Sequence, residues 1–232
     1  MQIQGFQKTT LLDYPGHLAA TVFLGGCNFC CPFCHNKEFV LPPLESASYK
    51  PEEVLAHLKK RCHVLDGVCI SGGEPTISSD LLPFIVKIRS LGLKIKLDTN
   101  GYRPDVLKML CQKKLLDYVA MDIKGSPSTY EKITGFPSID MSRIQSSIDC
   151  LMEQDIPFEF RTTAVKQLHT LEDFKQIGQW IRGAPIYFLQ QYRDSEQVIS
   201  PGFSPHTKEE LESFQSLLQK TIPIVEIRGL GN

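Results

Sequence analysis

The sequence AATVFLGGCNFCCPFC, residues 19–34, joins an apolar run to a cluster of four cysteines. The run of residues 19–24 predicts a buried β-strand, and the glycine pair that follows ends it. Cys27, Cys30, Cys31 and Cys34 lie within eight residues of one another. Such a cluster in a cytosolic chain of this size favours metal binding or redox chemistry, because a fold with a full core does not need disulfides.

Outward from this stretch, apolar β-branched runs alternate with amphipathic segments. The predicted strands are residues 19–24, 67–71, 94–98, 118–122, 157–163 and 185–191, and the predicted helices are residues 51–62, 79–91, 104–113, 141–154, 171–182 and 207–220. Strands that alternate with helices in this way form a parallel sheet with right-handed crossovers. Six units are too few for a closed eight-fold barrel. The predicted fold class is therefore α/β, a partial (β/α)6 barrel of the TIM type.

We expect one domain over residues 1–232, with the partial barrel at about 17–195 and a C-terminal helix and edge strand at about 206–228. The apolar run 222–227 supplies the edge strand. The segments Leu41-Pro42-Pro43 and 126–138 are expected to be long ordered loops, because they are rich in proline, glycine and serine.

Composition excludes several classes of protein. The chain has 232 residues, 42% of them hydrophobic and 22% charged, which is enough to bury a full core. A net charge of -1 and a pI of about 6.6 argue against broad nucleic-acid binding. The N-terminus shows no signal segment, and no run of about 18 apolar residues is present. We expect a cytoplasmic protein with neither membrane nor nucleic acid as its partner.

Polar, glycine-rich clusters follow all six predicted strands. In barrels of this type the carboxyl ends of the strands build the active site, so clusters far apart in the sequence are expected to meet at one mouth. They are the cysteine loop from Gly25, then residues 71–76, 98–101, 122–125, 161–163 and 190–193.

The cysteine spacing predicts the kind of metal site. Cys27-x3-Cys31-x2-Cys34 offers three thiolates, which suit three corners of a cubane iron–sulfur cluster and leave the fourth iron open to a small molecule. The register Cys27-x2-Cys30 is the alternative and suits zinc or redox chemistry. Zinc usually takes a second ligand pair, and Cys62 and Cys69 lack the x2 spacing.

These motifs resemble those of the radical S-adenosylmethionine (radical SAM) enzymes. The turn Asp13-Tyr14-Pro15-Gly16, ahead of Gly-Cys-Asn-Phe at 26–29 and Cys-His-Asn at 34–36, is similar to the activating proteins of anaerobic ribonucleoside-triphosphate reductase. The resemblance implies a [4Fe-4S] cluster, S-adenosylmethionine, a 5′-deoxyadenosyl radical, a large glycyl-radical enzyme as partner and a flavodoxin- or ferredoxin-type electron donor. It implies cluster ligation by Cys27, Cys31 and Cys34.

The same resemblance implies roles at the other strand ends. Gly72, Gly73 and Glu74 match the motif that approaches the methionine amine of the cofactor, and the remaining cofactor-binding positions are Asp98, Asn100, Asp122, Lys124 and Arg161. Some activases hold a monovalent cation here, and Asp98, Thr99, Asp122 and the carbonyl of Ala120 match by position. From the residues alone, Asp98 and Asp122 also suit capping or an ion pair with Lys124, and Arg161 suits a pair with Glu159 or Glu131.

Three alternatives stay open at the level of sequence. One is activation of another glycyl-radical enzyme of the formate-lyase type. A second is a small-molecule radical SAM enzyme such as a 7-carboxy-7-deazaguanine synthase. The third is a non-enzymatic iron–sulfur or zinc protein. His169 is expected at the surface or in a loop, and the four scattered cysteines are expected to be small buried hydrophobes.

Overall fold

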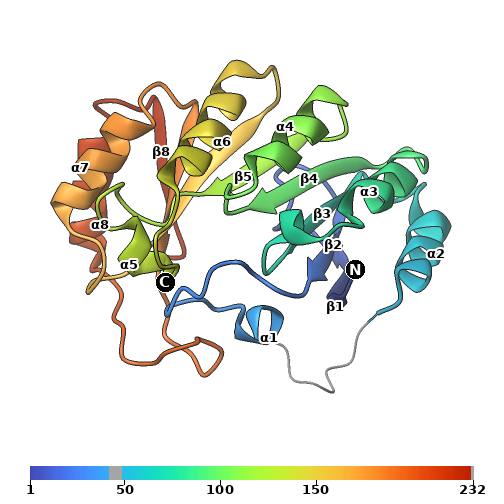
Figure 1. Cartoon of the computed structure of the whole chain (residues 1–232), viewed down its shortest axis with the longest axis horizontal. Coiled ribbons are helices and arrows are strands. Elements are labelled where there is room, and N and C mark those ends of the chain that lie inside the picture. Colours follow the sequence, from blue (N-terminus) through green and yellow to red (C-terminus); the bar gives the residue numbers. More distant parts are fainter. Residues whose placement is uncertain (42–48, 231–232) are drawn as a thin grey trace.

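The computed structural model describes residues 1–41 and 49–230, and its strands form one eight-stranded sheet in the order β1 to β8 (Figure 1). The strands are β1 (Ile3–Thr10), β2 (Ala19–Leu24), β3 (Gly67–Gly72), β4 (Lys94–Thr99), β5 (Tyr118–Asp122), β6 (Phe158–Ala164), β7 (Ile186–Gln191) and β8 (Ile224–Arg228). β1 pairs with β2 antiparallel, and every later neighbour pair is parallel.

Helices connect the parallel strands, and most of them lie along the outer side of the curved sheet (Figure 1). They are α1 (Lys37–Val40), α2 (Pro51–Arg61), α3 (Leu81–Arg89), α4 (Pro104–Gln112), α5 (Tyr130–Thr134), α6 (Met141–Glu153), α7 (Leu171–Trp180) and α8 (Lys208–Leu218), with a 3-10 turn at Pro75–Ile77. The predicted partial α/β barrel is confirmed. β1 and β8 are the two ends of the sheet, so the barrel is open between them.

Burial explains why the inner strands were visible in the sequence. β3 and β5 are almost wholly buried, so their side chains read as continuous apolar runs. Two long helices begin with reciprocal caps, in which Thr170 pairs with Asp173 and Thr207 with Glu210. These caps fix where each helix starts after its strand.

The first strand was not predicted. β1 buries only its two ends, Ile3 and Thr10, and its middle residues are half-buried or exposed. An edge strand with this pattern shows neither a continuous apolar run nor a clean alternation. It forms one end of the sheet and pairs with β2.

Two predicted loops have different outcomes. The expected loop 126–138 contains the short helix α5, which ends at Gly135 in a left-handed conformation with φ of 63°. In the other, Pro42 and Pro43 lie outside the described residues. The predicted edge strand at 222–227 is present as β8.

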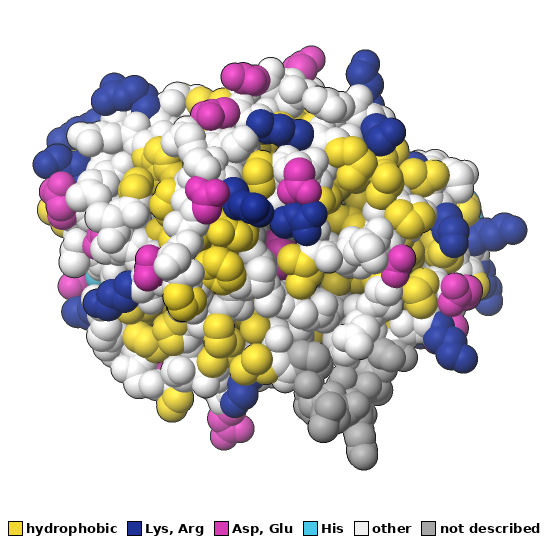
Figure 2. Space-filling model, in the orientation of Figure 1, with side chains coloured by type: hydrophobic (Ala, Val, Ile, Leu, Met, Phe, Trp, Pro, Cys, Tyr) yellow, Lys and Arg dark blue, Asp and Glu magenta, His cyan; other side chains and the backbone are white. Residues whose placement is uncertain are grey.

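The surface agrees with the near-neutral charge of the chain. Figure 2 shows basic and acidic side chains interspersed over the face it presents. Among the described helices, none has the length and apolar character needed to cross a membrane.

Candidate active site

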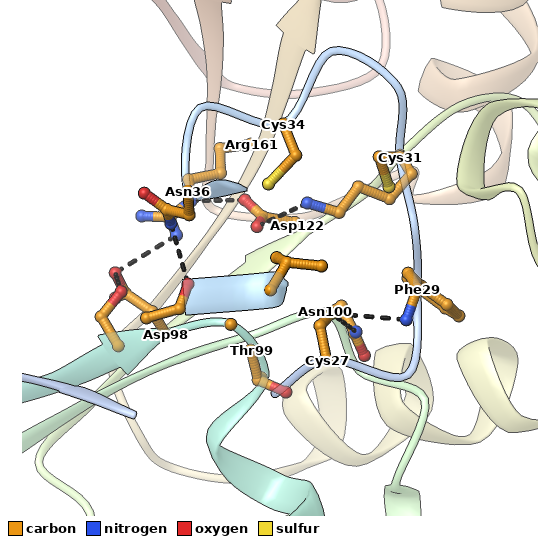
Figure 3. A pocket seen from close by; sticks show the side chains of 15 residues that line it. Cys27, Phe29, Cys31, Cys34, Asn36, Asp98, Thr99, Asn100, Asp122 and Arg161 are labelled. Atoms are coloured by element: carbon orange, nitrogen blue, oxygen red, sulfur yellow. Dashed lines mark hydrogen bonds and ion pairs between the residues drawn. The ribbon is translucent and has the colours of Figure 1, made fainter. Parts of the chain in front are cut away.

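The carboxyl ends of the parallel strands meet at one pocket (Figure 3). Five of the six predicted clusters contribute to it, and its lining is Cys27, Phe29, Cys31, Cys34, Asn36, Val40, Ser71, Gly72, Gly73, Asp98, Thr99, Asn100, Asp122, Lys124 and Arg161. The cluster after β7 does not. There Gln191 donates to the carbonyl of His206 at 3.0 Å, and Arg193 donates to the carbonyl of Gly229 at 2.9 Å.

The loop after β2 presents three of its four cysteines to this pocket. Cys27, Cys31 and Cys34 line it, whereas Cys30 is exposed and its backbone N–H donates to the carbonyl of Thr134 at 3.0 Å. A distant segment holds the far side of the loop, because the N–H of Ile199 donates to the carbonyl of Cys34 at 3.2 Å. The geometry therefore favours the Cys27, Cys31, Cys34 register over one that uses Cys30.

The surroundings of Cys27 fit an iron–sulfur cluster. The backbone N–H of Phe29 donates to Cys27 Sγ at 3.3 Å, and Asn100 Nδ2 approaches the same sulfur at 3.9 Å. The Nδ2 of Asn28 is buried and has no acceptor in the part of the chain that the structure describes. Donors aimed at a sulfur stabilise the negative charge of thiolates and cluster sulfides. Among the described residues, there is no group of three or more His, Cys, Asp and Glu side chains that could hold a single metal ion.

Burial also sets the protonation of the thiols. It raises the pKa of Cys27 and of Cys31 to about 12, and it raises the pKa of Cys34 as well. The thiols stay protonated at neutral pH, so metal binding must displace their protons.

The two glycines at the end of β3 are required by the protein's own backbone. Gly72 has φ of +115°, and a Cβ built on it lies 2.3 Å from the carbonyl oxygen of Leu24. A Cβ on Gly73 lies 2.0 Å from the carbonyl oxygen of Gly26. The N–H of Gly73 donates to the carbonyl of Leu24 at 2.9 Å. These glycines let β3 approach the start of the cysteine loop and hold it in place.

Glu74 has different partners from those predicted. Its carboxylate is buried, and it is not among the residues that line the pocket. It accepts hydrogen bonds from Thr99 Oγ1 at 2.7 Å and from the N–H of Asn100 at 2.6 Å. Burial raises the pKa of Glu74 despite these bonds. These bonds tie the carboxylate to the end of β4.

An ionic network forms another wall of the pocket. Arg161 bridges two carboxylates, with its Nε 2.5 Å from Asp122 and an Nη 3.2 Å from Asp98. Lys124 Nζ lies 2.9 Å from Asp122, and Lys96 pairs with Asp98. Burial alone would raise the pKa of both carboxyls, but Arg161 and the lysines outweigh it and lower them.

This network involves the residues predicted to hold a monovalent cation. The oxygens of Asp98 and Asp122 already accept bonds from fixed cations, and the Thr99 hydroxyl donates to Glu74. Lys96, Lys124 and Arg161 against two carboxylates leave one net positive charge on the network, although Lys96 itself lies outside the pocket lining. An anionic group such as the carboxylate of an amino-acid ligand suits that charge better than a metal cation.

Sequence reasoning missed two supporting side chains. Asn36 Nδ2 donates to the carbonyl of Gly72 at 2.8 Å and ties the end of the cysteine loop to β3. His169, predicted at the surface or in a loop, is buried in a loop, with Nε2 donating to the carbonyl of Lys124 at 2.8 Å and Nδ1 accepting from the N–H of Val165 at 3.1 Å. For His169, the available signal was its position directly before Thr170, the N-cap of α7.

The scattered cysteines behave largely as predicted. Cys69, Cys111 and Cys150 are buried, whereas Cys62 is half-buried and donates to the carbonyl of Lys59 at 3.2 Å.

Comparison with known proteins agrees with this geometry. The family model of the radical SAM superfamily matches residues 21–181, which include every predicted site residue. The chain belongs to the radical SAM superfamily. Members of this family use a [4Fe-4S] cluster together with S-adenosylmethionine, and these are the cofactors of the enzyme. Cys27, Cys31 and Cys34 are the three cysteines that line the pocket.

A relative that aligns over nearly its full length indicates which radical SAM enzymes this chain resembles. A protein of Methanocaldococcus jannaschii, named as a glycyl-radical enzyme activating enzyme, is 31% identical over 99% of this chain and 96% of its own length. A protein of Haemophilus influenzae with the same name is 36% identical over 36% of this chain and 32% of its own length. The radical SAM enzyme described here is therefore grouped with the glycyl-radical enzyme activating enzymes.

Solved structures share the fold. A domain of the pyruvate-formate lyase-activating enzyme from Bacteroides vulgatus superposes with a TM-score of 0.57 at 19% identity, covering 70% of this chain and 99% of that one. SuiB from Streptococcus suis, solved with S-adenosylmethionine, superposes with a TM-score of 0.68 at 13% identity, covering 90% of this chain and 52% of that one.

Proposed function

We propose that this radical SAM enzyme installs a glycyl radical on anaerobic ribonucleoside-triphosphate reductase. The turn Asp13-Tyr14-Pro15-Gly16 and the Cys-His-Asn sequence that starts at Cys34 support this choice of partner. A cytoplasmic location and a flavodoxin- or ferredoxin-type electron donor belong to the same proposal, because the reaction needs a low-potential electron.

One structural observation supports a macromolecular substrate. The barrel is open between β1 and β8, and a groove of about 460 Å³ is lined by the turn after β1 and by side chains of β4, β6, β7 and β8. Asp98 and Arg161 line both this groove and the cysteine pocket. A chain segment in the groove would therefore reach the wall of the cofactor pocket without unfolding the enzyme.

The residues of the site have distinct tasks in this proposal. When bound, the cluster and S-adenosylmethionine supply a one-electron reductive cleavage that yields a 5′-deoxyadenosyl radical. Cys27, Cys31 and Cys34 hold the cluster. The ammonium of Lys124 and the guanidinium of Arg161 orient the carboxylate of the cofactor, and the buried strand ends keep water from the radical.

Small-molecule radical SAM chemistry is the competing function. Proteins named as probable GTP 3′,8-cyclases match this chain at 27–34% identity, and the chain covers 41–46% of their length. The full-length match to an activating enzyme favours the glycyl-radical function.

Electron paramagnetic resonance tests the proposal. Cluster-loaded, reduced enzyme is mixed without oxygen with S-adenosylmethionine and the anaerobic ribonucleoside-triphosphate reductase of the same organism. We expect a glycyl radical on the reductase, absent when the reductase's radical-site glycine is replaced by alanine. Cleavage of S-adenosylmethionine with no radical on the reductase, but with one on a formate-lyase type enzyme, would reassign the partner.

A further inference from the structure

The turn that follows β1 presents two leucines to solvent. Leu11 is 72% exposed and Leu12 is 89% exposed, the two most exposed of the large hydrophobic side chains described. Both border the groove at the open side of the barrel. Adjacent exposed leucines at the rim of a groove are typical of an interaction surface.

The protein holds these leucines in place. Thr10 Oγ1 accepts a hydrogen bond from the N–H of Leu12 at 3.1 Å, and Thr10 itself is buried at the end of β1. On the other side, Asp13 accepts a hydrogen bond from Thr21 of β2 at 2.5 Å. The two tethers bracket the leucines, so their exposure is a property of the fold rather than of a loose end.

The charged side chains of the groove neutralise one another. Arg228 on β8 pairs with Glu159 on β6 at 2.9 Å and lies over the ring of Phe188. Arg161 and Lys96 pair with Asp98. The groove thus combines an apolar rim, paired charges and one amide, Gln190. This chemistry suits an uncharged polypeptide segment and does not suit a phosphate-rich ligand.

We propose that Leu11 and Leu12 anchor the glycine-bearing segment of the partner enzyme at the entrance of this groove. The inference rests on the proposed function and assigns its docking surface. An apolar side chain of the partner packs on the two leucines, and the glycine enters the groove towards Asp98 and Arg161. We assign the groove to the partner segment because the groove and the cofactor pocket share a wall.

The double variant Leu11→Ser/Leu12→Ser tests the anchor. We expect its KM for the reductase to rise on the order of tenfold, with kcat at saturating partner unchanged. Partner-independent reductive cleavage of S-adenosylmethionine and the iron content are also expected to stay at wild-type values. The matched control is Val86→Ser/Leu171→Ser, which removes two exposed apolar side chains that lie outside the groove.

The outcomes separate the two proposals. If the wild-type enzyme forms no glycyl radical on the reductase, the proposed function fails. If it does, but the double variant has the wild-type KM, the docking inference alone is overturned. Light scattering provides the other decisive result, since a wild-type dimer that the double variant dissociates would assign the leucines to a second copy of this chain and overturn the inference.

Discussion

Arg161 carries the most consequential contacts in the site, and its removal tests the ionic wall. The variant Arg161→Gln leaves Asp98 and Asp122 with one lysine each and without the guanidinium that bridges them. The side chains of Arg161 and Asp98 are 15% and 14% exposed, so solvent relieves the unpaired charge only in part. Removing one member of a buried ion pair costs about 3 kcal/mol or more.

We therefore expect Arg161→Gln to lower the free energy of unfolding by about 3 kcal/mol, which shifts the urea midpoint by about 1 M. Urea unfolding of the metal-free protein, followed by circular dichroism, measures it. The double variant Arg161→Gln/Asp122→Asn also leaves Lys124 without its carboxylate and is expected to lose about 1 kcal/mol more. Arg103→Gln is the control, because Arg103 and Asp105 form an exposed pair worth at most about 1 kcal/mol.

Two results would refute this reasoning. One is a loss in Arg161→Gln no larger than that in Arg103→Gln. The other is a double variant that is more stable than Arg161→Gln itself, because the ion pair between Lys124 and Asp122 would then not support the fold.

Three further predictions concern the cluster, the strand ends and pH. Replacing Cys27, Cys31 or Cys34 by alanine is expected to abolish loading of about four irons per chain, whereas exposed Cys30→Ala keeps it, as iron analysis after anaerobic reconstitution will show. Gly73→Ala places a Cβ 2.0 Å from the carbonyl oxygen of Gly26. We expect the free energy of unfolding to fall by about 3 kcal/mol or more and iron loading to be impaired. Wild-type values in both urea unfolding and iron analysis would contradict the assigned packing. Asp173 has a lowered pKa because the hydroxyl and backbone donors of Thr170, with Ser126 and Thr129, outweigh its burial. A lowered carboxyl pKa stabilises the fold at pH values above the unfolded pKa of about 3.9, and this stabilisation is lost as the pH falls. Asp173→Asn should therefore lower the free energy of unfolding by about 1–2 kcal/mol at pH 7 and by little in acid. A loss of stability that is independent of pH in urea titrations would contradict this prediction.

The sequence predicted the inner strands almost to the residue, because strands buried on both faces of a parallel sheet read as apolar runs. β2 and β5 have the predicted bounds, β3, β4 and β7 differ by one residue at one end, and β6 is shifted by one residue at both ends. β1 escaped because its middle is not buried. The short helix α5 was not predicted, because five residues between turn signals are too few to show a helical periodicity.

The positions of the site residues were predictable, but their partners were not. Topology alone brings residues after parallel strands to one mouth, so Asp98, Asp122 and Arg161 were expected to be neighbours. Which charges pair depends on side-chain reach and burial, which a sequence does not contain. For the same reason the hydrogen bonds from Thr99 and Asn100 to Glu74 could not be predicted.

Transfer of a hydrogen from glycine to the cofactor is the central claim, and deuterium follows it directly. The reductase is prepared with its glycines deuterated at Cα and is activated by the reduced enzyme with S-adenosylmethionine. Mass spectrometry of the 5′-deoxyadenosine formed should show one deuterium, with a glycyl radical on the partner. Unlabelled 5′-deoxyadenosine in an otherwise complete reaction would contradict the account.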